Sequence, residues 1–241
     1  MSRDEIYASD DGPEGPFEFS ASVAEVFPDM LRRSIPGYAA SIQAIRSLTR
    51  EYATAGSVLY DLGCSLGAAS RAMAQGISVS DCRIVAVDNA PAMVRKCRAL
   101  FDADPVTTPL EVICGDVRDT TIENASVVVM NYTLQFLPPG DRDAVIGSIA
   151  AGLNPGGVFV LSEKVIHPDP TIEAALQSLH LDFKRRHAYS EMEIARKRAA
   201  LENVLVPDTV DAHETRLTAA GFKSVGVWLR YFNFVSMIAI R

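Results

Sequence analysis

The spacing of hydrophobic residues changes near residue 57, and the change separates two kinds of predicted element. Between residues 22 and 52 apolar side chains recur at helical spacing, interrupted once at Pro36-Gly37. Beyond residue 57 the apolar residues gather in short runs that stop at glycine, aspartate or asparagine. Short apolar runs that end in turn residues are typical of buried strands. The chain is therefore expected to begin with helices and to continue into a sheet.

Five such runs alternate with helical segments in the middle of the chain. The runs cover residues 57–60, 83–87, 110–114, 126–130 and 158–161. Helical patterns follow the first run at about residues 67–75, the second from Pro91 onward, and the fourth at about residues 141–153. Strands that alternate with helices in this way form a parallel sheet covered on both faces.

The end of the chain follows a different pattern. A helix is predicted at residues 210–220, and two strand-like runs follow at residues 224–231 and 234–240. Because only two residues separate these runs, they must pair antiparallel. The predicted fold class is therefore α/β and Rossmann-like, a mostly parallel sheet with a C-terminal antiparallel hairpin and helices on both faces. This arrangement resembles the fold of S-adenosylmethionine-dependent methyltransferases.

The same pattern predicts the domain organisation. Residues 1–16 are polar and acidic, and we expect a disordered tail there. Residues 17–241 suffice for a single domain with a large core, which includes a helical insertion at about residues 169–206. No apolar run approaches the roughly 18–20 residues of a membrane-spanning helix, and the first residues lack the layout of a secretory signal. We therefore expect a cytoplasmic protein without membrane contact.

Composition and charge narrow the choice of ligand. The chain has a net charge of −7, whereas tight nonspecific binding of nucleic acid needs a cationic face. Direct nucleic-acid binding is therefore not expected. Basic clusters at residues 32–33, 184–186 and 196–198 suit either solvated helix faces or a patch for an anionic small molecule. No Cys-x-x-Cys pair is present, so we expect no metal site. Small, buried, reduced thiols are expected at Cys64, Cys82, Cys97 and Cys114.

Polar residues follow the first four predicted strands, at the edge where parallel sheets bind ligands. The turn at Gly63 allows a ligand close to the backbone. Asp88 is placed to accept both ribose hydroxyls of a nucleoside, and Asp116 to accept from an adenine amino group. Together with Cys64, Ser65, Asn89 and Asn131, these residues predict an adenosine-type ligand, with the Gly63–Ser65 turn against its amino-acid part.

Two other readings of this loop were weighed. A dinucleotide-binding loop needs glycines where this chain has Ser65 and Ala68. Residues 63–67 also match the Gly-x-Ser-x-Gly nucleophile elbow of hydrolases, but the candidate His213 is predicted on the polar side of its helix. The fourth strand is followed by Asn131-Tyr132-Thr133, which lacks the motif of methyltransferases that act on amino groups of nucleic-acid bases.

Arg198 stands out within the helical insertion. It falls on the apolar stripe of Ile194, Leu201 and Leu205, four residues after the first and three before the second. A guanidinium on an apolar face needs an anion. It could extend to solvent or pair with a neighbouring glutamate, or it could hold a ligand carboxylate in two parallel hydrogen bonds.

Several segments resemble the carboxy-S-adenosyl-L-methionine synthase family, and the resemblance extends from about residue 17 to residue 241. The segments that carry it are Val26-Phe27-Pro28-Asp29-Met30, Arg33-Ser34-Ile35-Pro36-Gly37-Tyr38, Tyr60-Asp61-Leu62-Gly63-Cys64-Ser65-Leu66-Gly67-Ala68, Thr133-Leu134-Gln135-Phe136 and Leu201-Glu202-Asn203-Val204. The chain departs from the family pattern at Ala90, where serine is frequent, and at His187-Ala188.

The resemblance implies an enzyme that converts S-adenosyl-L-methionine and prephenate into carboxy-S-adenosyl-L-methionine and phenylpyruvate. It also implies a homodimer whose product passes to a tRNA carboxymethyltransferase for modification of the wobble uridine. Arg198 would hold the new carboxylate and is the expected catalytic residue. The nucleoside ligand would contact Tyr38, Gly63, Cys64, Ser65, Asp88, Asn89, Asp116, Val117 and Asn131.

Prephenate is a dianion and therefore needs cations. Arg198 is the first expectation, followed by Arg32, Arg33 and Arg185, and no histidine is placed as an obvious general base. The main alternative function is an ordinary small-molecule methyltransferase that uses S-adenosylmethionine. A binding subunit without catalysis is a further alternative.

Overall fold

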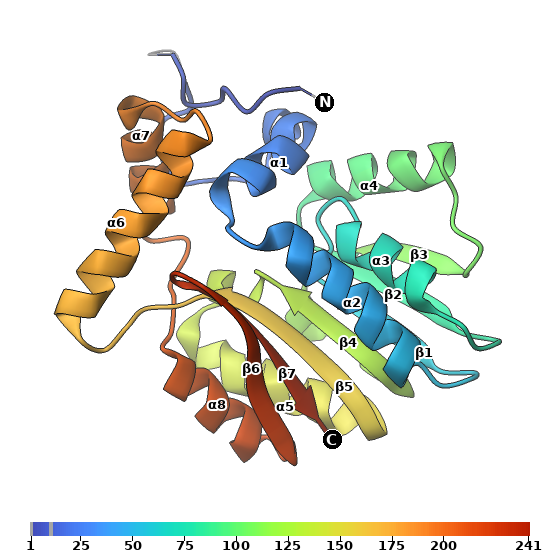
Figure 1. Ribbon diagram of the computed structural model, residues 1–241. Coiled ribbons are helices and arrows are strands. Elements are labelled where there is room, and N and C mark those ends of the chain that lie inside the picture. The colour runs from blue at the N-terminus through green and yellow to red at the C-terminus, as the bar shows by residue number, and fades with distance from the viewer. Residues whose placement is uncertain (1, 10–11) are drawn as a thin grey trace.

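One seven-stranded sheet runs through the computed structural model, which describes residues 2–9 and 12–241 (Figure 1). The strands lie in the order β3-β2-β1-β4-β5-β7-β6. Strands β1 to β5 pair parallel, and β7 pairs antiparallel with both β5 and β6. Their bounds are β1 Val58–Leu62, β2 Arg83–Asp88, β3 Leu110–Cys114, β4 Ala125–Asn131, β5 Leu153–Lys164, β6 Ser224–Tyr231 and β7 Phe234–Ile240. The predicted parallel sheet and terminal hairpin are confirmed.

Five helices cover the two faces of the sheet. They are α2 (Tyr38–Tyr52), α3 (Ala68–Gly76) and α4 (Pro91–Ala103) on one face, and α5 (Arg142–Gly152) and α8 (Val210–Ala219) on the other. Ile45 of α2 and Met73 of α3 belong to the core on the first face, and Ile146 of α5 and Leu217 of α8 to the core on the second. Because both faces are buried, the central strands consist almost wholly of apolar residues.

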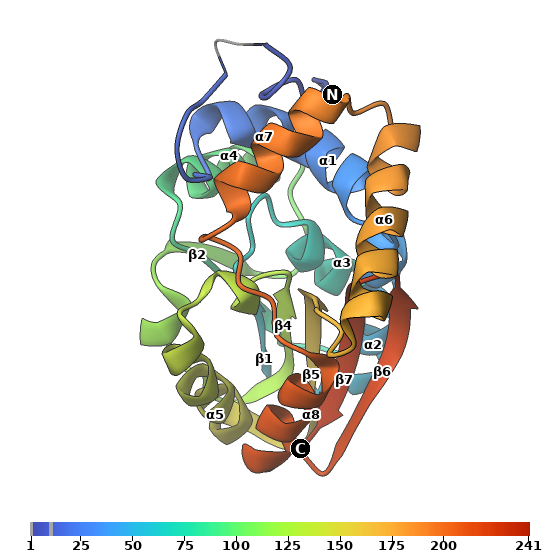
Figure 2. The ribbon, with the colours of Figure 1, turned by 90° about the vertical axis from the view of Figure 1, so that its left-hand side faces the viewer.

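A further group of helices lies beyond the carboxyl ends of the parallel strands. It consists of α1 (Ala21–Ser34), α6 (Pro170–Arg186) and α7 (Glu191–Leu201), which Figure 2 shows above the sheet. Phe27 and Met30 of α1 share a small core with Ala200 of α7. Short 3-10 turns complete this end at η1 (Val117–Asp119), η2 (Leu134–Phe136) and η3 (Pro139–Asp141). The insertion therefore covers the edge of the sheet where the ligand is predicted.

The described part of the N-terminal segment does not match the disordered tail expected for residues 1–16. Asp4 and Tyr7 are buried. The backbone N–H of Asp4 donates to Asp29 Oδ2 at 2.9 Å, its carbonyl accepts from Arg33 Nη1 at 2.8 Å, and its carboxylate accepts from the Tyr189 hydroxyl. The segment is ordered because Arg33 and Tyr189 donate hydrogen bonds to Asp4. Residues 1, 10 and 11 of the predicted tail lie outside the described residues.

Two expectations about single residues are wrong for tertiary reasons. His213 is buried, with 2% of its surface exposed, because it lies on the same side of α8 as Leu217, which belongs to the core. Cys114 is exposed, since it ends the outermost parallel strand β3, whereas the other three cysteines are buried as predicted. All four cysteines are free thiols. In the described part of the chain, no helix combines the length and apolar character needed to cross a membrane.

Candidate active site

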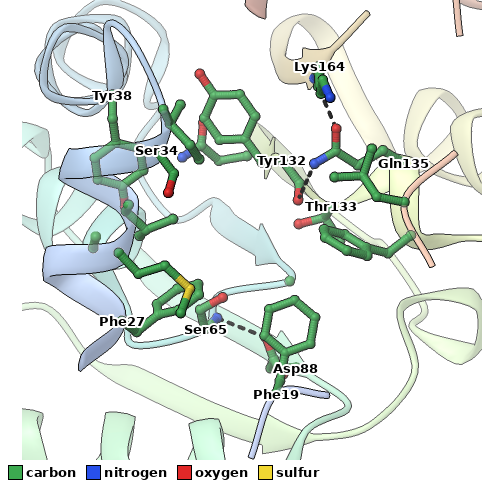
Figure 3. Close-up of a pocket in the computed structure, with 18 of the residues that line it drawn as sticks. Phe19, Phe27, Ser34, Tyr38, Ser65, Asp88, Tyr132, Thr133, Gln135 and Lys164 are labelled. Atoms are coloured by element: carbon green, nitrogen blue, oxygen red, sulfur yellow. Dashed lines mark hydrogen bonds between the residues drawn. The ribbon is translucent and has the colours of Figure 1, made fainter. Parts of the chain in front are cut away.

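A cavity of about 320 Å³ opens at the carboxyl ends of the parallel strands, beneath the helices of the insertion (Figure 3). Its wall combines strand ends from the sheet with side chains of α1, α6 and α7. Nine of the ten predicted site residues line it, namely Tyr38, Gly63, Cys64, Ser65, Asp88, Asn89, Asp116, Val117 and Asn131. The structure thus brings the predicted nucleoside residues into one cavity.

The turn after β1 approaches the neighbouring elements too closely for a side chain at Gly63. Gly63 has φ of +83°, and a Cβ atom there would lie 2.1 Å from Thr133 Oγ1. The N–H groups of Gly63 and Cys64 both donate to the Val87 carbonyl, at 2.8 and 3.0 Å. These bonds hold the turn against the end of β2, so that the residues after Gly63 face the cavity beside Asp88.

The carboxylate of Asp88 is fixed by two backbone donors. Oδ2 accepts from Ser65 N–H at 2.8 Å, and Oδ1 accepts from Ala90 N–H at 2.9 Å (Figure 3 draws the first of these). Burial raises the pKa of Asp88, and the two N–H donors oppose that rise. Each carboxylate oxygen keeps a lone pair for a further donor. The group is therefore oriented to accept two hydroxyl groups of a ligand in the cavity.

Two more strand ends present polar groups to the same cavity. Asp116 accepts hydrogen bonds from the backbone and the guanidinium of Arg118, which lower the pKa of this carboxyl group. It therefore stays ionised and also starts the 3-10 turn η1. Asn131, the last residue of β4, carries a buried Oδ1 with no hydrogen-bond partner among the described residues. A buried acceptor without a partner is costly, so a ligand donor at this point would be stabilising.

Aromatic side chains enclose the part of the cavity near Asp88. Phe19 packs edge-to-face against Phe17, Phe27 and Phe136, with ring centroids 5.1, 6.1 and 5.3 Å away. Phe19 and Asp88 both line the cavity, and Figure 3 draws them in the same part of it. An apolar enclosure with a few fixed polar groups is the usual construction of a small-molecule site, and flat rings suit a purine base.

The cavity also contains residues that the sequence did not single out as site residues. Asp61 is buried in β1 and accepts from the N–H and hydroxyl of Ser70 at 2.8 and 2.5 Å, and burial raises its pKa to about 6. His180 of α6 lines the cavity with Nε2 2.8 Å from the Ser34 carbonyl oxygen, and burial lowers its pKa to about 3. Asp61 belongs to the segment around the Gly63 turn that carries the family resemblance, whereas His180 has no local signal, because α6 reaches the cavity only through tertiary packing.

Arg198 does not line the cavity and is exposed. The buried positions of α7 include Ile194, Lys197 and Ala200, so Lys197 faces inward in its place. Both lysine and arginine satisfy the spacing of three or four residues from Ile194 and Leu201, and the rotation of the helix decides between them. Burial is the main cause of the lowered pKa of Lys164 and Lys184, and the charge of Arg198 acts in the same direction.

Across residues 2–9 and 12–241, no group of three or more histidine, cysteine, aspartate or glutamate side chains is arranged to hold a metal ion.

Comparison with known proteins gives consistent results. A family model described as a methyltransferase domain matches residues 59–157. Carboxy-S-adenosyl-L-methionine synthase of Shewanella oneidensis is 52% identical over 240 residues, which cover 100% of this chain and 99% of the relative. The protein of the same name from Klebsiella pneumoniae is 48% identical and covers 99% of this chain and 97% of the relative.

Solved structures support the same fold. An O-methyltransferase family protein from Burkholderia thailandensis matches with a TM-score of 0.63 at 17% identity, covering 92% of this chain and 60% of that one. Human N-acetylserotonin methyltransferase in complex with S-adenosylmethionine matches with a TM-score of 0.60 at 16% identity, covering 92% and 55%. At these identities the likeness establishes the fold alone.

Proposed function

Because this chain belongs to the carboxy-S-adenosyl-L-methionine synthase family, we propose that it converts S-adenosyl-L-methionine and prephenate into carboxy-S-adenosyl-L-methionine, phenylpyruvate and water. The observation that carries the proposal is the cavity in which Asp88, Asp116 and Asn131 converge beside the turn at Gly63. It provides for an adenosine group, and the whole-length similarity selects the synthase among enzymes of this fold.

The residues of the cavity suggest how the first substrate binds. Asp88 accepts the ribose hydroxyls, Asp116 lies where the adenine amino group would donate, and Phe19 covers the base. The Gly63–Ser65 turn and Tyr38 contact the methionine part of the substrate. Asn131 Oδ1 accepts a hydrogen bond from the same part. In this arrangement the sulfonium methyl group faces the interior of the cavity, away from bulk water.

The proposed reaction moves a carboxyl group from prephenate to the methyl carbon of S-adenosylmethionine. The methyl group loses a proton, and prephenate releases carbon dioxide and its ring hydroxyl. The methyl carbon, now a carbanion, bonds to the carbon dioxide, and the proton and hydroxyl leave as water. A carbanion beside a positive sulfur is favoured where water is excluded and fixed charges are preorganised. The mostly apolar wall of the cavity supports this requirement. Arg198 lies outside the cavity wall, and we propose that its long side chain turns toward the new carboxylate when the product is bound.

The identity of the product tests the function. Purified protein is incubated with S-adenosylmethionine and prephenate, and the masses of the nucleoside products are measured by mass spectrometry. A mass gain of one carboxyl group supports the synthase. The alternative of an ordinary small-molecule methyltransferase predicts S-adenosylhomocysteine and a methylated acceptor, and a binding subunit predicts no turnover.

We further propose that the chain forms a homodimer in the cytoplasm and passes its product to a tRNA carboxymethyltransferase. Support for the dimer comes from exposed apolar side chains on α6 and the edge strand β6, namely Ile172, Leu179, Val227, Trp228 and Tyr231. Exposed apolar patches and sheet edges are typical of interfaces. Analytical sedimentation of the wild type and of Leu179→Glu tests the dimer. We expect a dimer for the wild type and a monomer for the variant, whereas a wild-type monomer would contradict the proposal.

A further inference from the structure

Three lysines line the cavity. Lys164 is the last residue of β5, Lys184 lies in the last turn of α6, and Lys197 lies in α7. Figure 3 shows Lys164 near Gln135, across the cavity from Asp88 and Phe19. The helical insertion provides two of these lysines, whereas Gly63, Asp88 and Asp116 lie at the ends of β1, β2 and β3.

These lysines have too few carboxylate partners within the protein. Asp4 Oδ2 lies 3.5 Å from Lys197 Nζ, and the same oxygen also accepts from the Tyr189 hydroxyl. Among the described residues, no carboxylate oxygen lies within 4 Å of the Nζ atom of Lys164 or Lys184. Lys164 and Lys184 are half-buried, and an ammonium group withdrawn from water without a nearby anion is unfavourable. The arrangement therefore favours an anion from outside the chain.

Burial and the surrounding charges determine the pKa values of the three lysines in the protein without a ligand. Burial, followed by repulsion from the neighbouring cations, lowers the pKa of Lys184 to about 7. Burial also lowers the pKa of Lys197 to about 8, although Asp4 and Glu193 act in the other direction. The pKa of Lys164 is lowered by burial and Arg198, with Glu173 opposing. A dianion among these groups would restore their charge.

We propose that Lys164, Lys184 and Lys197 form the subsite that binds the two carboxylates of the second substrate. The proposal rests on the proposed function, for which that substrate is prephenate. Lysine donors on three separate elements can reach carboxylates at both ends of a rigid dicarboxylate, through charge-assisted hydrogen bonds. The dianion then lies in the same cavity as the methionine part of the first substrate, with the nucleoside at the other side.

Direct binding tests the subsite without turnover. Prephenate is titrated by calorimetry into protein saturated with S-adenosylhomocysteine, for wild type, Lys184→Met, Lys164→Met and the exposed control Lys223→Met. Each cavity variant is expected to bind prephenate at least about tenfold more weakly, from loss of a hydrogen bond to a charged group. The affinity for S-adenosylhomocysteine and the Lys223→Met variant should match wild type. Lys184→Met should also raise the melting temperature, because it removes a half-buried cation that has no carboxylate partner.

Two results overturn the proposal. Unchanged prephenate affinity in both Lys164→Met and Lys184→Met shows that the lysines do not bind it. An equal loss of S-adenosylhomocysteine affinity assigns them instead to the methionine carboxylate. If Lys184→Met does not fold, Lys184→Arg replaces it and should retain prephenate binding. Wild-type protein that binds prephenate through these lysines but makes no carboxylated nucleoside supports the subsite and refutes the proposed function.

Discussion

The backbone N–H of Ser65 donates to Asp88 Oδ2 at 2.8 Å, which joins the turn after β1 to the carboxylate that ends β2. Ser65 has φ of +48°, a left-handed conformation that directs its N–H at the neighbouring strand end. The shape of the turn and the orientation of Asp88 therefore depend on each other. A ligand that contacts both the turn and Asp88 therefore binds to a single coupled structure.

Replacement of Asp88 by asparagine should remove most of the affinity for the nucleoside. The amide would present an N–H group to one of the two backbone donors, Ser65 or Ala90, and it carries no charge for the ribose hydroxyls. With two hydrogen bonds to a charged group weakened, S-adenosylhomocysteine should bind about 100-fold more weakly by calorimetry. Asp102→Asn, on the exposed side of α4, is the control. Equal affinity in the two variants would refute the role of Asp88.

Alanine substitutions at Gly56 and Gly63 distinguish the energetic cost of a left-handed backbone from the cost of a steric clash. Gly56 and Gly63 both have positive φ, +71° and +83°, but only the Cβ of Gly63→Ala would meet another side chain, Thr133. Gly56→Ala should lower the free energy of unfolding by about 1–2 kcal/mol from the left-handed conformation alone. Gly63→Ala should lower it by roughly 3–4 kcal/mol, since overpacking adds to the same conformational cost. Urea unfolding of both variants measures the difference, and equal losses would show that Thr133 yields without strain.

The strand ends of the site could be predicted from sequence because topology determines where they meet. Once the apolar runs are known to be parallel strands, Gly63, Asp88, Asp116 and Asn131 must share one edge of the sheet. The structure places all four at one cavity. The positions follow from the order of elements and need no knowledge of side-chain packing.

The helical wall of the site could not be predicted in the same way. Lys197 and Arg198 fit the apolar spacing of α7 equally well, and only packing against α1 turns Lys197 inward. Asp4 has the sequence context of a disordered tail, yet it is buried against Arg33 and Tyr189. The bond between Asp4 and Tyr189 joins residues 185 positions apart, and α7 begins more than 150 residues after α1 ends. No local pattern records such contacts.

Arg198 can be tested as the ligand of the new carboxylate despite its exposed position. Arg198→Ala should bind carboxy-S-adenosyl-L-methionine at least about tenfold more weakly, because a charge-assisted pair is lost. S-adenosylmethionine, which lacks that carboxylate, should bind nearly as well as it does to wild type. Arg196→Ala on the same helix is the control for a change in overall charge. Equal loss of affinity for both nucleosides in Arg198→Ala would contradict the assignment.

His213 should make the stability of the fold depend on pH below neutrality. Burial lowers its pKa to about 4, with Arg216 acting in the same direction. His213 therefore takes up a proton near pH 6.5 in the unfolded chain but stays neutral in the folded chain. The free energy of unfolding decreases as the pH falls below 6.5. Between pH 7 and 5.5 the loss from this group should be about 1 kcal/mol. In His213→Gln, urea unfolding should show a smaller decrease over this range, with the remainder due in part to His180, whose pKa is also lowered. A decrease as large as that of wild type would show that His213 takes up its proton without unfolding.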